Sequence, residues 1–396
     1  MIFVSLREKN SQIMKERFYS LDVFRGLTVC LMIMVNNPGD WGHIYAPLDH
    51  AQWAGCTPTD MVFPFFLFVV GNAFAFVLPR LREAGTPAFV RKVIRRSLLI
   101  FAIGLFLNWF PFVAWKDNAL VGKAWENIRI FGVLQRIAAA YFFGSLIIYF
   151  CKPKTAIIIS IIILAGYWLL CDALGAPGDP YSISGWFGTA QVDIPILGVN
   201  HMYHGEGIPF DPEGIASSLC PIVQVVIGYL AGKFIREKGK TYEMVAQLFV
   251  AGAIMLFAGA FFGQFFIIAK KIWTSTFVLY TSGMAMIILA VVIYFIEMKN
   301  KRFWLDKFFN VFGKNPLFIF VLSGLLPRAL WLIRIPNGVV NGQPSYTNPL
   351  GWFYQHICVP VFSNPYNSSL MYAICFIIFM WVIVYWMDKR KIYVKV

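Results

Sequence analysis

Long apolar runs alternate with short polar segments along almost the whole chain. Each run holds about 18–23 residues, enough for a helix to cross roughly 30 Å of hydrocarbon. The pattern therefore predicts an all-α polytopic membrane protein with ten transmembrane helices. The predicted spans begin near Leu21, Asp60, Val93, Ile130, Thr155, Ile215, Met244, Thr274, Asn315 and Ser369.

Composition supports this prediction. Apolar residues make up 59% of the 396 residues and charged residues 14%, against about 45–50% and 25% in soluble domains. The mean hydropathy is +0.65. These values exclude a disordered, fibrous or ordinary soluble protein. The net charge of +14 therefore does not indicate nucleic acid, and the question becomes on which side of the membrane it lies.

The distribution of Lys and Arg predicts the orientation. With the N-terminus in the cytoplasm, 26 of the 34 basic residues fall in inner segments and six in outer ones, a strong positive-inside bias. The acidic residues divide nine inside and eleven outside, so the inner face carries +17 and the outer face −5. We expect one transmembrane domain over residues 1–396 with both termini cytoplasmic. Its parts include a cytoplasmic segment 1–20 and long extracytoplasmic loops at 175–214 and 334–368.

Charged residues near the start of the first span are costly in a membrane unless they are paired or line a cavity. Asp22 and Arg25 are three residues apart, so they can pair on a helix. One interpretation is a structural ion pair at the inner end. The other is an Arg that binds a phosphate group entering from the cytoplasm, with Asp22 holding it in place.

The loop between the first two spans concentrates polar residues and has no Lys or Arg. It carries Asn36, Asp49, His50, Trp53 and Asp60 where two helices meet the outer interface. A structural interpretation is that Asp60 or its neighbouring Thr caps the second helix and that His50 is a solvated loop residue. Capping alone does not explain the whole cluster.

A second polar cluster precedes the sixth span. His201 and His204 have H-x-x-H spacing that could hold a metal, but no third ligand has a matching spacing, and we predict no metal. Asp211 and Glu213 form an acidic turn that could cap the following helix or bind a hydroxyl or amine of a substrate. Arg136 lies about two turns inside the fourth span and needs a partner or a cavity.

Aromatic residues are unevenly distributed. Ten of the 13 Trp fall in the predicted outer half, Trp53 and Trp273 among them. Many belong to an interfacial belt. Aromatic faces beside carboxylates are also how proteins hold sugar rings, so the second interpretation is a sugar site.

The sequence resembles the heparan-α-glucosaminide N-acetyltransferase-like family of transmembrane acetyltransferases. The resemblance runs through seven stretches in the same order. They are R-x-x-S-L-D-V-F-R-G (Arg17–Gly26), V-N-N-P-G (Val35–Gly39), H-A-Q-W-A-G-C-T-P-T-D-M-V-F-P (His50–Pro64), G-V-L-Q-R-I (Gly132–Ile137), N-H-M-Y-H (Asn200–His204), F-D-P-E-G (Phe210–Gly214) and W-T-S (Trp273–Ser275).

The resemblance implies transfer of an acetyl group from cytosolic acetyl-CoA to a glucosamine amine across the membrane. It implies that His50 is the catalytic His, Asn36 the active-site Asn and Asp60 the Asp ahead of V-F-P. It also suggests a homodimer. The loop between Asn36 and His50 looks longer, as in bacterial members, so we expect a multi-pass protein of a bacterial cytoplasmic membrane. The chain also starts close to the first stretch, without the luminal N-terminal region of lysosomal members.

These observations combine into one hypothesis. Basic residues bind the coenzyme A phosphates, and the candidates are Arg25, Arg95, Arg96, Arg136 and Lys314. His50 acts as general base, a role that suits an imidazole with an ordinary pKa near 6.5. Asn36 donates to the developing oxyanion, and Asp60 or Asp49 orients the ring. The acceptor is bound by Asp49, Trp53, His201, His204, Asp211, Glu213 and Trp273.

Several alternatives stay open on the sequence alone. The acetyl group could pass through an acetyl-His50 intermediate. The acceptor could be a hydroxyl of a cell-surface glycan instead of an amine. A protein of a different class, a transporter of amino sugars or oligosaccharides, would also have many spans and an aromatic sugar site. The chain shows no inverted repeat, which counts against the transporter.

Overall fold

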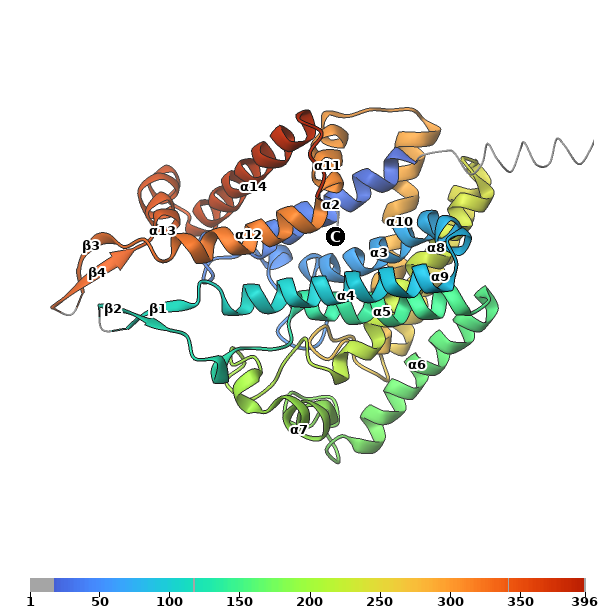
Figure 1. Cartoon of the computed structure of the whole chain (residues 1–396), viewed down its shortest axis with the longest axis horizontal. Helices are drawn as coiled ribbons and strands as arrows, with labels where there is room; N and C mark the ends of the chain where they lie inside the picture. The colour runs from blue at the N-terminus through green and yellow to red at the C-terminus, as the bar shows by residue number, and fades with distance from the viewer. Residues whose placement is uncertain (1–17, 117, 341, 395–396) are drawn as a thin grey trace, which may run out of the picture.

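The computed structural model describes residues 18–116, 118–340 and 342–394, so most of the predicted segment 1–20 lies outside the described residues. Long helices form a bundle with two small hairpins at one end (Figure 1). The helices are α2 (Tyr19–Val35), α3 (Pro58–Glu83), α4 (Thr86–Trp109), α5 (Val133–Phe150), α6 (Pro153–Leu174), α7 (Ile194–Leu197), α8 (Leu219–Lys238), α9 (Tyr242–Phe262), α10 (Ser275–Ile293), α11 (Trp304–Lys314), α12 (Pro316–Leu330), α13 (Pro349–Phe353) and α14 (Pro365–Lys389).

Helices lie at all ten predicted places, but the structure does not confirm ten membrane crossings. Within the described ranges, seven helices are long and apolar enough to cross a membrane, and an eighth is added if α11 and α12 count as one bent span. Helix α2 is short, with 17 residues. Helix α4 carries four basic residues in its first half, Arg91, Lys92, Arg95 and Arg96. These two helices account for the difference between ten predicted spans and eight, and α12, with 15 residues, is the third when the bent pair is not counted.

Burial separates central helices from peripheral ones. In the most apolar part of α3 and of α8, 72% and 78% of the positions are buried, against 17% in both α6 and α9. Helices α3 and α8 therefore form the centre of the bundle. The apolar residues of α6 and α9 lie on the surface, where a bilayer would cover them.

Glycines allow the two central helices to touch backbone to backbone. A β-carbon on Gly71 of α3 would lie 1.9 Å from the carbonyl oxygen of Val225, and one on Gly228 of α8 would lie 2.0 Å from that of Phe68. Small residues at such crossings are typical of membrane helices. Lipid tails are as apolar as the helix surfaces, so close packing, and not the hydrophobic effect, holds the helices together. Helices α3 and α8 are therefore packed tightly against each other, and α3 carries Asp60 in its first turn.

The predicted ninth span corresponds to α12, which meets the preceding helix α11 at a bend of 83°. Helix α12 begins at Pro316, where a Pro in the first turn suits a helix start. Helix α11 lies in a stretch that the sequence pattern assigned to a polar inner segment. It packs against α2 so closely that a β-carbon on Gly26 would lie 1.7 Å from the carbonyl oxygen of Phe309.

Residues of α14 and of the segment that follows it contact this bend and hold it in place. Lys314 contacts both carboxylate oxygens of Asp388 at 2.8 Å. Asn315 donates its Nδ2 to the carbonyl of Ile392 at 3.0 Å and accepts the backbone N–H of Val394 at 2.8 Å. The junction of α11 and α12 is therefore held by α14 and the residues that follow it.

Two antiparallel hairpins lie in segments that the pattern predicted as loops. They pair β1 (Val113–Lys116) with β2 (Ala119–Gly122), and β3 (Ile335–Val340) with β4 (Gln343–Thr347). The predicted loop 334–368 is thus partly regular, because it also holds α13 and a π-helical turn at Tyr354–Cys358. We call the end that carries β1–β4 the hairpin end.

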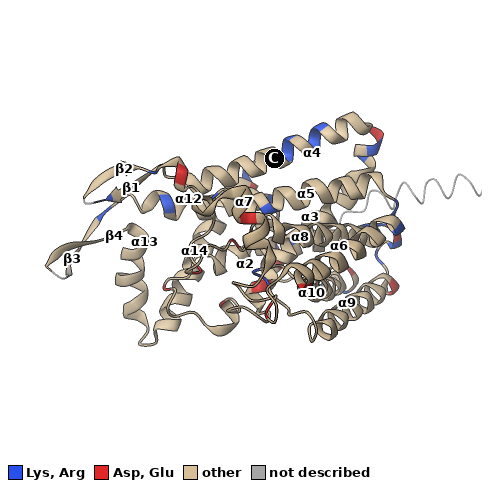
Figure 2. Cartoon of the chain, turned by 90° about the horizontal axis from the view of Figure 1, so that it is seen from below, with Lys and Arg blue, Asp and Glu red and all other residues tan. Residues whose placement is uncertain are grey.

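Basic residues gather toward the opposite end, where α3 ends and α4, α6 and α9 begin (Figure 2). We call this the basic end. This uneven distribution of basic residues between the two ends agrees with the positive-inside prediction. Which end faces the cytoplasm stays a prediction.

Candidate functional site

His50 and Asp60 are in direct contact at the hairpin end of α3. The Nδ1 of His50 lies 2.7 Å from Oδ1 of Asp60. The His50 side chain is 40% exposed while that of Asp60 is 1% exposed. Because a carboxylate accepts only, this contact favours the tautomer with the proton on Nδ1 and the lone pair on Nε2, which lies 3.4 Å from the Nζ of Lys270. Of the two candidates for orienting the ring, Asp60 contacts it, whereas Asp49 accepts the backbone N–H of His50.

The other carboxylate oxygen of Asp60 caps the N-terminus of α3. Oδ2 accepts the backbone N–H groups of Ala51 and Thr57, each at 3.0 Å. Thr57 is the N-cap residue of α3, and it forms a reciprocal capping box with Asp60. The structural and the chemical interpretations of Asp60 are therefore compatible, since each uses a different oxygen.

Lys270, in the segment between α9 and α10, completes this group. Its Nζ lies 3.0 Å and 3.4 Å from the two ring nitrogens of His50 and 3.4 Å from Oδ1 of Asp60. Burial lowers the pKa of Lys270, while the charges of Asp60 and Glu213 act in the opposite direction. A partly buried ammonium thus neutralises the Asp60 carboxylate beside the imidazole. We call His50, Asp60 and Lys270 the His50 group.

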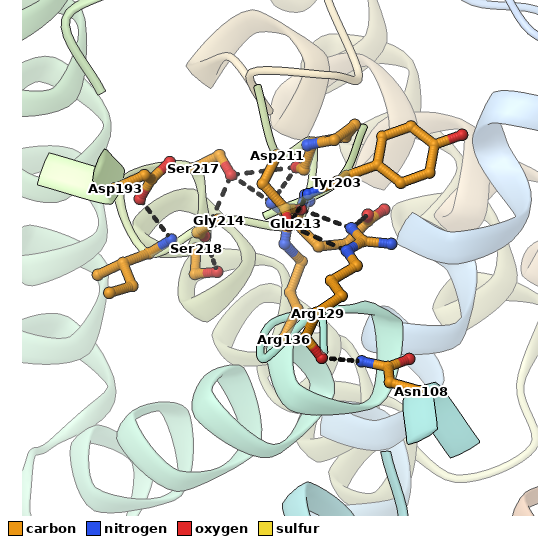
Figure 3. A network of polar contacts seen from close by, with 12 residues as sticks. Asn108, Arg129, Arg136, Asp193, Tyr203, Asp211, Glu213, Gly214, Ser217 and Ser218 are labelled. Carbon is orange, nitrogen blue, oxygen red and sulfur yellow. Dashed lines mark hydrogen bonds and ion pairs between the residues drawn. The ribbon is translucent and has the colours of Figure 1, made fainter. Parts of the chain in front are cut away.

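A second group of charges, the Arg129 cluster, lies nearby and is drawn in Figure 3. Arg129 donates through Nε to Asp211 at 2.9 Å, and its Nη2 contacts Asp211 and Glu213 at 2.5 Å. Asp211 is fully buried and also accepts the backbone N–H of Tyr203. Burial alone would raise the pKa of Glu213, but Arg129 and then Arg136 hold it below its ordinary value.

Arg136, which the sequence placed inside the fourth span, belongs to this cluster. Its Nη2 donates to the carbonyl of Pro212 and to Oγ of Ser217, and its guanidinium lies 4.9 Å from the ring centre of Trp273. Both Arg136 and Trp273 are buried. An embedded Arg requires partners, and Arg136 finds them in the turn before α8 and in the ring face of Trp273.

A cavity of about 410 Å³ opens beside the Arg129 cluster. It lies between α2, α4, α5 and α12 and holds mostly polar side chains on its walls. Asn36 and Arg129 are among them, whereas His50 is not. Its lining residues are Asn36, Asn37, Gly104, Leu107, Asn108, Arg129, Gly132, Val133, Leu134, Gln135, Phe320, Ser323, Gly324, Pro327 and Arg328.

Arg129 connects the two groups. It lines the cavity on one side and pairs with Glu213 on the other. The charge of Glu213 in turn acts on Lys270 of the His50 group. His50 and Asn36, predicted as two parts of one active site, are thus related indirectly: Asn36 shares the cavity wall with Arg129, which pairs with Glu213, and the charge of Glu213 acts on Lys270 beside His50.

The other predicted acceptor residues have mixed surroundings. The indole N–H of Trp53 donates to the carbonyl of Tyr181, and its ring packs on Phe210 at 5.6 Å. His201 contacts the carbonyl of Ile128 at 2.7 Å through Nδ1, and His204 is exposed. No three metal-ligating side chains come together in the described ranges.

The predicted coenzyme A residues do not form one group. Arg25 pairs with Asp22 at 2.5 Å, as the spacing predicted, and donates to the carbonyl of Gly313. Lys314, the next residue, pairs with α14. Arg96 lies over the ring of Tyr141 at 4.8 Å, and Arg95 is exposed. Arg136 contacts the turn before α8 instead, so only Arg25 and Lys314 share one junction.

Sequence analysis missed two members of the site. Lys270 is 220 residues from His50 in the chain, and Arg129 is 82 residues from Asp211. A weak signal was present for each. Lys270 precedes the W-T-S stretch, and Arg129 precedes a span in which another Arg lies embedded.

Comparison with known proteins agrees with the motifs. Residues 17–192 match a family described as heparan-alpha-glucosaminide N-acetyltransferase, catalytic. The heparan-alpha-glucosaminide N-acetyltransferases of Homo sapiens and Mus musculus are 27% and 26% identical, over 77% of this chain in each case. The matched part covers 52% and 53% of those proteins, so the chain spans about half the length of the curated relatives it matches. The predicted resemblance to this family is confirmed, and the family model matches it over residues 17–192.

Proposed function

We propose that the protein is a membrane acetyltransferase that moves the acetyl group of acetyl-CoA to the amine of a glucosamine-type sugar. The observation that carries the proposal is the 2.7 Å contact between His50 and Asp60. It supplies an oriented base, with a buried carboxylate behind it, at the residue that the family motifs single out. The names of the curated relatives describe the same chemistry on a glucosaminide.

His50 is the proposed general base. Its Nε2 accepts a proton from the acceptor amine, which takes the place of the 3.4 Å contact with Lys270, as the amine nitrogen bonds to the acetyl carbonyl carbon. The C–S bond then breaks, the coenzyme thiolate leaves, and the amide forms. Asp60 stabilises the imidazolium present after proton transfer. Lys270 supplies the counter-charge to Asp60 when the imidazole is neutral.

Asn36 is the proposed donor to the carbonyl oxygen of the tetrahedral intermediate. It lies on the wall of the 410 Å³ cavity together with Arg129 and Gln135. The Asn36 side chain is exposed at this wall, so its amide can donate to the oxygen as negative charge develops. We propose that the cavity takes the reacting end of the donor or the acceptor sugar.

The coenzyme phosphates are proposed to bind at the basic end, which we infer to be cytoplasmic. Arg25 and Lys314 lie together there, at the junction of α2, α11 and α14. Both already have carboxylate partners, which limits the charge that they offer a phosphate. Arg95 and Arg96, on the charged half of α4, are the further candidates.

The proposal is tested by acetyl-CoA turnover against a panel of amino sugars and their N-blocked counterparts, with product masses. We expect an added acetyl group on the free amine and none with N-blocked sugars. His50→Ala should reduce turnover about 10²–10⁴-fold, while His43→Ala, a loop histidine paired with Asp40, should retain it. Full turnover by His50→Ala, or vesicular uptake of unmodified sugar without acetylation, would contradict the proposal. Acetylated protein trapped without acceptor would assign the acetyl-His50 route.

A further inference from the structure

A large apolar hollow lies between α9 and α10, two helices that run side by side (Figure 2). It has a volume of about 540 Å³. We call it the α9–α10 groove. Its lining residues are Tyr242, Val245, Ala246, Phe249, Val250, Ala290, Val291, Tyr294 and Phe295. None of these side chains is charged, and the hydroxyls of the two Tyr are their only polar groups.

The groove opens where the close packing of the two helices ends. A β-carbon on Gly283 of α10 would lie 2.4 Å from the backbone nitrogen of Leu256, and one on Gly259 of α9 would lie 2.5 Å from that of Tyr280. These contacts lie toward the hairpin end, whereas the groove lies toward the basic end, where α9 begins. There α10 continues as a π-helical turn at Tyr294–Met298. Such turns interrupt the regular packing of a helix and are frequent at functional sites.

The lining side chains face outward from the bundle. Phe249, Val250 and Val291 are 45%, 56% and 41% exposed. From Tyr242 to Val250 the helix rises about 12 Å, and half of the hydrocarbon layer of a bilayer is about 15 Å thick. The groove therefore has the depth of one leaflet and an apolar surface that an acyl chain can cover.

A lysine is held at the mouth of this groove. Nζ of Lys299 lies 5.4 Å from the ring centre of Tyr294 and 5.9 Å from that of Tyr242. The backbone N–H of Lys299 donates to the carbonyl of Tyr294 at 2.9 Å. Because both Tyr line the groove, the ammonium stands where the apolar surface ends and the polar headgroup region of a bilayer would begin.

The nearby carboxylates are paired with other lysines. Glu297 lies 3.1 Å from Nζ of Lys240. Glu243 lies 2.8 Å from Nζ of Lys238. Lys299 itself has no ion pair within the part of the chain that the structure describes. Its charge is therefore available to an anion that approaches from the bilayer.

We propose that the α9–α10 groove binds one anionic phospholipid, with an acyl chain along the groove and the phosphate group at Lys299. The hydroxyls of Tyr242 and Tyr294 donate to phosphate oxygens, and their ring faces hold the ammonium in place. A zwitterionic lipid would fill the apolar part equally well, but it carries its own cation beside the phosphate. One basic residue at the membrane surface favours the anionic headgroup about fivefold.

The test is native mass spectrometry of the full chain in detergent, titrated separately with phosphatidylglycerol and with phosphatidylcholine of identical acyl chains. We expect one tightly held phosphatidylglycerol, bound about fivefold more tightly than phosphatidylcholine, and a preference that decreases as salt is raised. Lys299→Ala should abolish the preference and leave phosphatidylcholine binding unchanged, whereas Lys299→Arg should retain it. Ala246→Trp, which fills the groove, should weaken both lipids about tenfold by excluding about two methylene groups.

Two matched variants serve as controls. Lys389 also lies over a Tyr, 5.0 Å from the ring centre of Tyr385, on α14, so Lys389→Ala should keep the preference for phosphatidylglycerol. Ala251 is exposed on α9 but does not line the groove. Ala251→Trp should therefore leave both affinities within about twofold of wild type.

Equal affinity of the wild-type protein for the two lipids would overturn the proposal, as would a preference that survives Lys299→Ala. Ala246→Trp that abolishes self-association while leaving lipid binding unchanged would assign the groove to a second copy of the chain instead. None of these measurements uses acetyl-CoA. The lipid site can therefore fail or hold whatever becomes of the proposed acetyl transfer.

Discussion

The two ends of the bundle hold their charges in different ways. At the hairpin end, Arg129 pairs with Asp211 across 82 residues of sequence, and the carboxylate is fully buried. At the basic end, Lys233 pairs with Glu237 one helical turn away, and the Glu237 side chain is 52% exposed. Long-range buried pairs fix the arrangement of loops, whereas local exposed pairs contribute little to stability. Sequence analysis finds the second kind easily and the first kind poorly.

The largest effect is expected at Asp60. Asp60→Asn replaces the acceptor that fixes the His50 tautomer, and activity should fall about 10²–10⁴-fold. Asp49→Asn is the control, since Asp49 contacts only the backbone N–H of the same His through its side chain and should keep most activity. Turnover and apparent melting temperature are measured together. Equal losses in the two variants would show that the ring does not depend on Asp60.

The next effect tests the comparison of the two ends directly. Arg129→Met leaves Asp211 and Glu213 buried without their main cation, which should cost about 3–5 kcal/mol of unfolding free energy. Lys233→Met at the basic end should cost less than about 1 kcal/mol. Thermal unfolding in the same detergent measures both. Similar shifts would mean that burial of the cluster does not determine its contribution.

Lys270 and Lys271 are adjacent in sequence but contact different partners. Lys271 pairs with Glu206 at 2.7 Å, outside the His50 group. In Lys270→Met the Asp60 carboxylate loses its ammonium, so we expect the imidazole to take up a proton instead and turnover to fall about 10–100-fold at neutral pH. Raising the pH should partly restore it. Lys271→Met should show neither change, and a loss that does not respond to pH would contradict this role.

A smaller effect is expected from Asp193, a buried carboxyl at the hairpin end. Its Oδ1 accepts the backbone N–H groups of Ile215 and Ala216, while its Oδ2 has no hydrogen-bond partner among the described residues. Burial raises its pKa to about 6 from an ordinary 3.8. The folded state then binds the proton more tightly, so the free energy of unfolding should decrease by roughly 2–3 kcal/mol as the pH rises through about 4–6.

Asp193→Asn should flatten that pH dependence. The contrasting residue is Asp40, whose pKa is lowered by hydrogen bonds from His43 and then Gly42. The Asp40 contribution to the free energy of unfolding is present above the ordinary carboxyl pKa and is lost as the pH falls. The free energy of unfolding therefore rises with pH through Asp40, whereas it falls with pH through Asp193. Apparent melting temperatures of wild type, Asp193→Asn and Asp40→Asn are compared between about pH 3 and 8, since the Asp40 contribution is lost below the ordinary carboxyl pKa of 3.8. An unchanged slope in Asp193→Asn would assign the effect to another group.

Much of the architecture could be predicted from the apolar pattern, because helices of membrane length leave a direct trace in sequence. The site was predictable in part. His50 and Asp60 were named from one loop, but choosing Asp60 over Asp49 required the capping geometry of α3. Arg136 was recognised as embedded, yet its partners lie before α8, 76 residues away or more. Contacts between distant loops follow no local period, so Lys270 could not be assigned to His50.

The bend between α11 and α12 has a practical consequence for anyone who attaches a reporter to this protein. Asp388, Ile392 and Val394 hold Lys314 and Asn315 in place, and the neighbouring Gly313 carbonyl accepts from Arg25. A fluorescent fusion joined directly at residue 387 would delete all three contacts and alter the neighbourhood of Arg25. A fusion placed after residue 394 would preserve them.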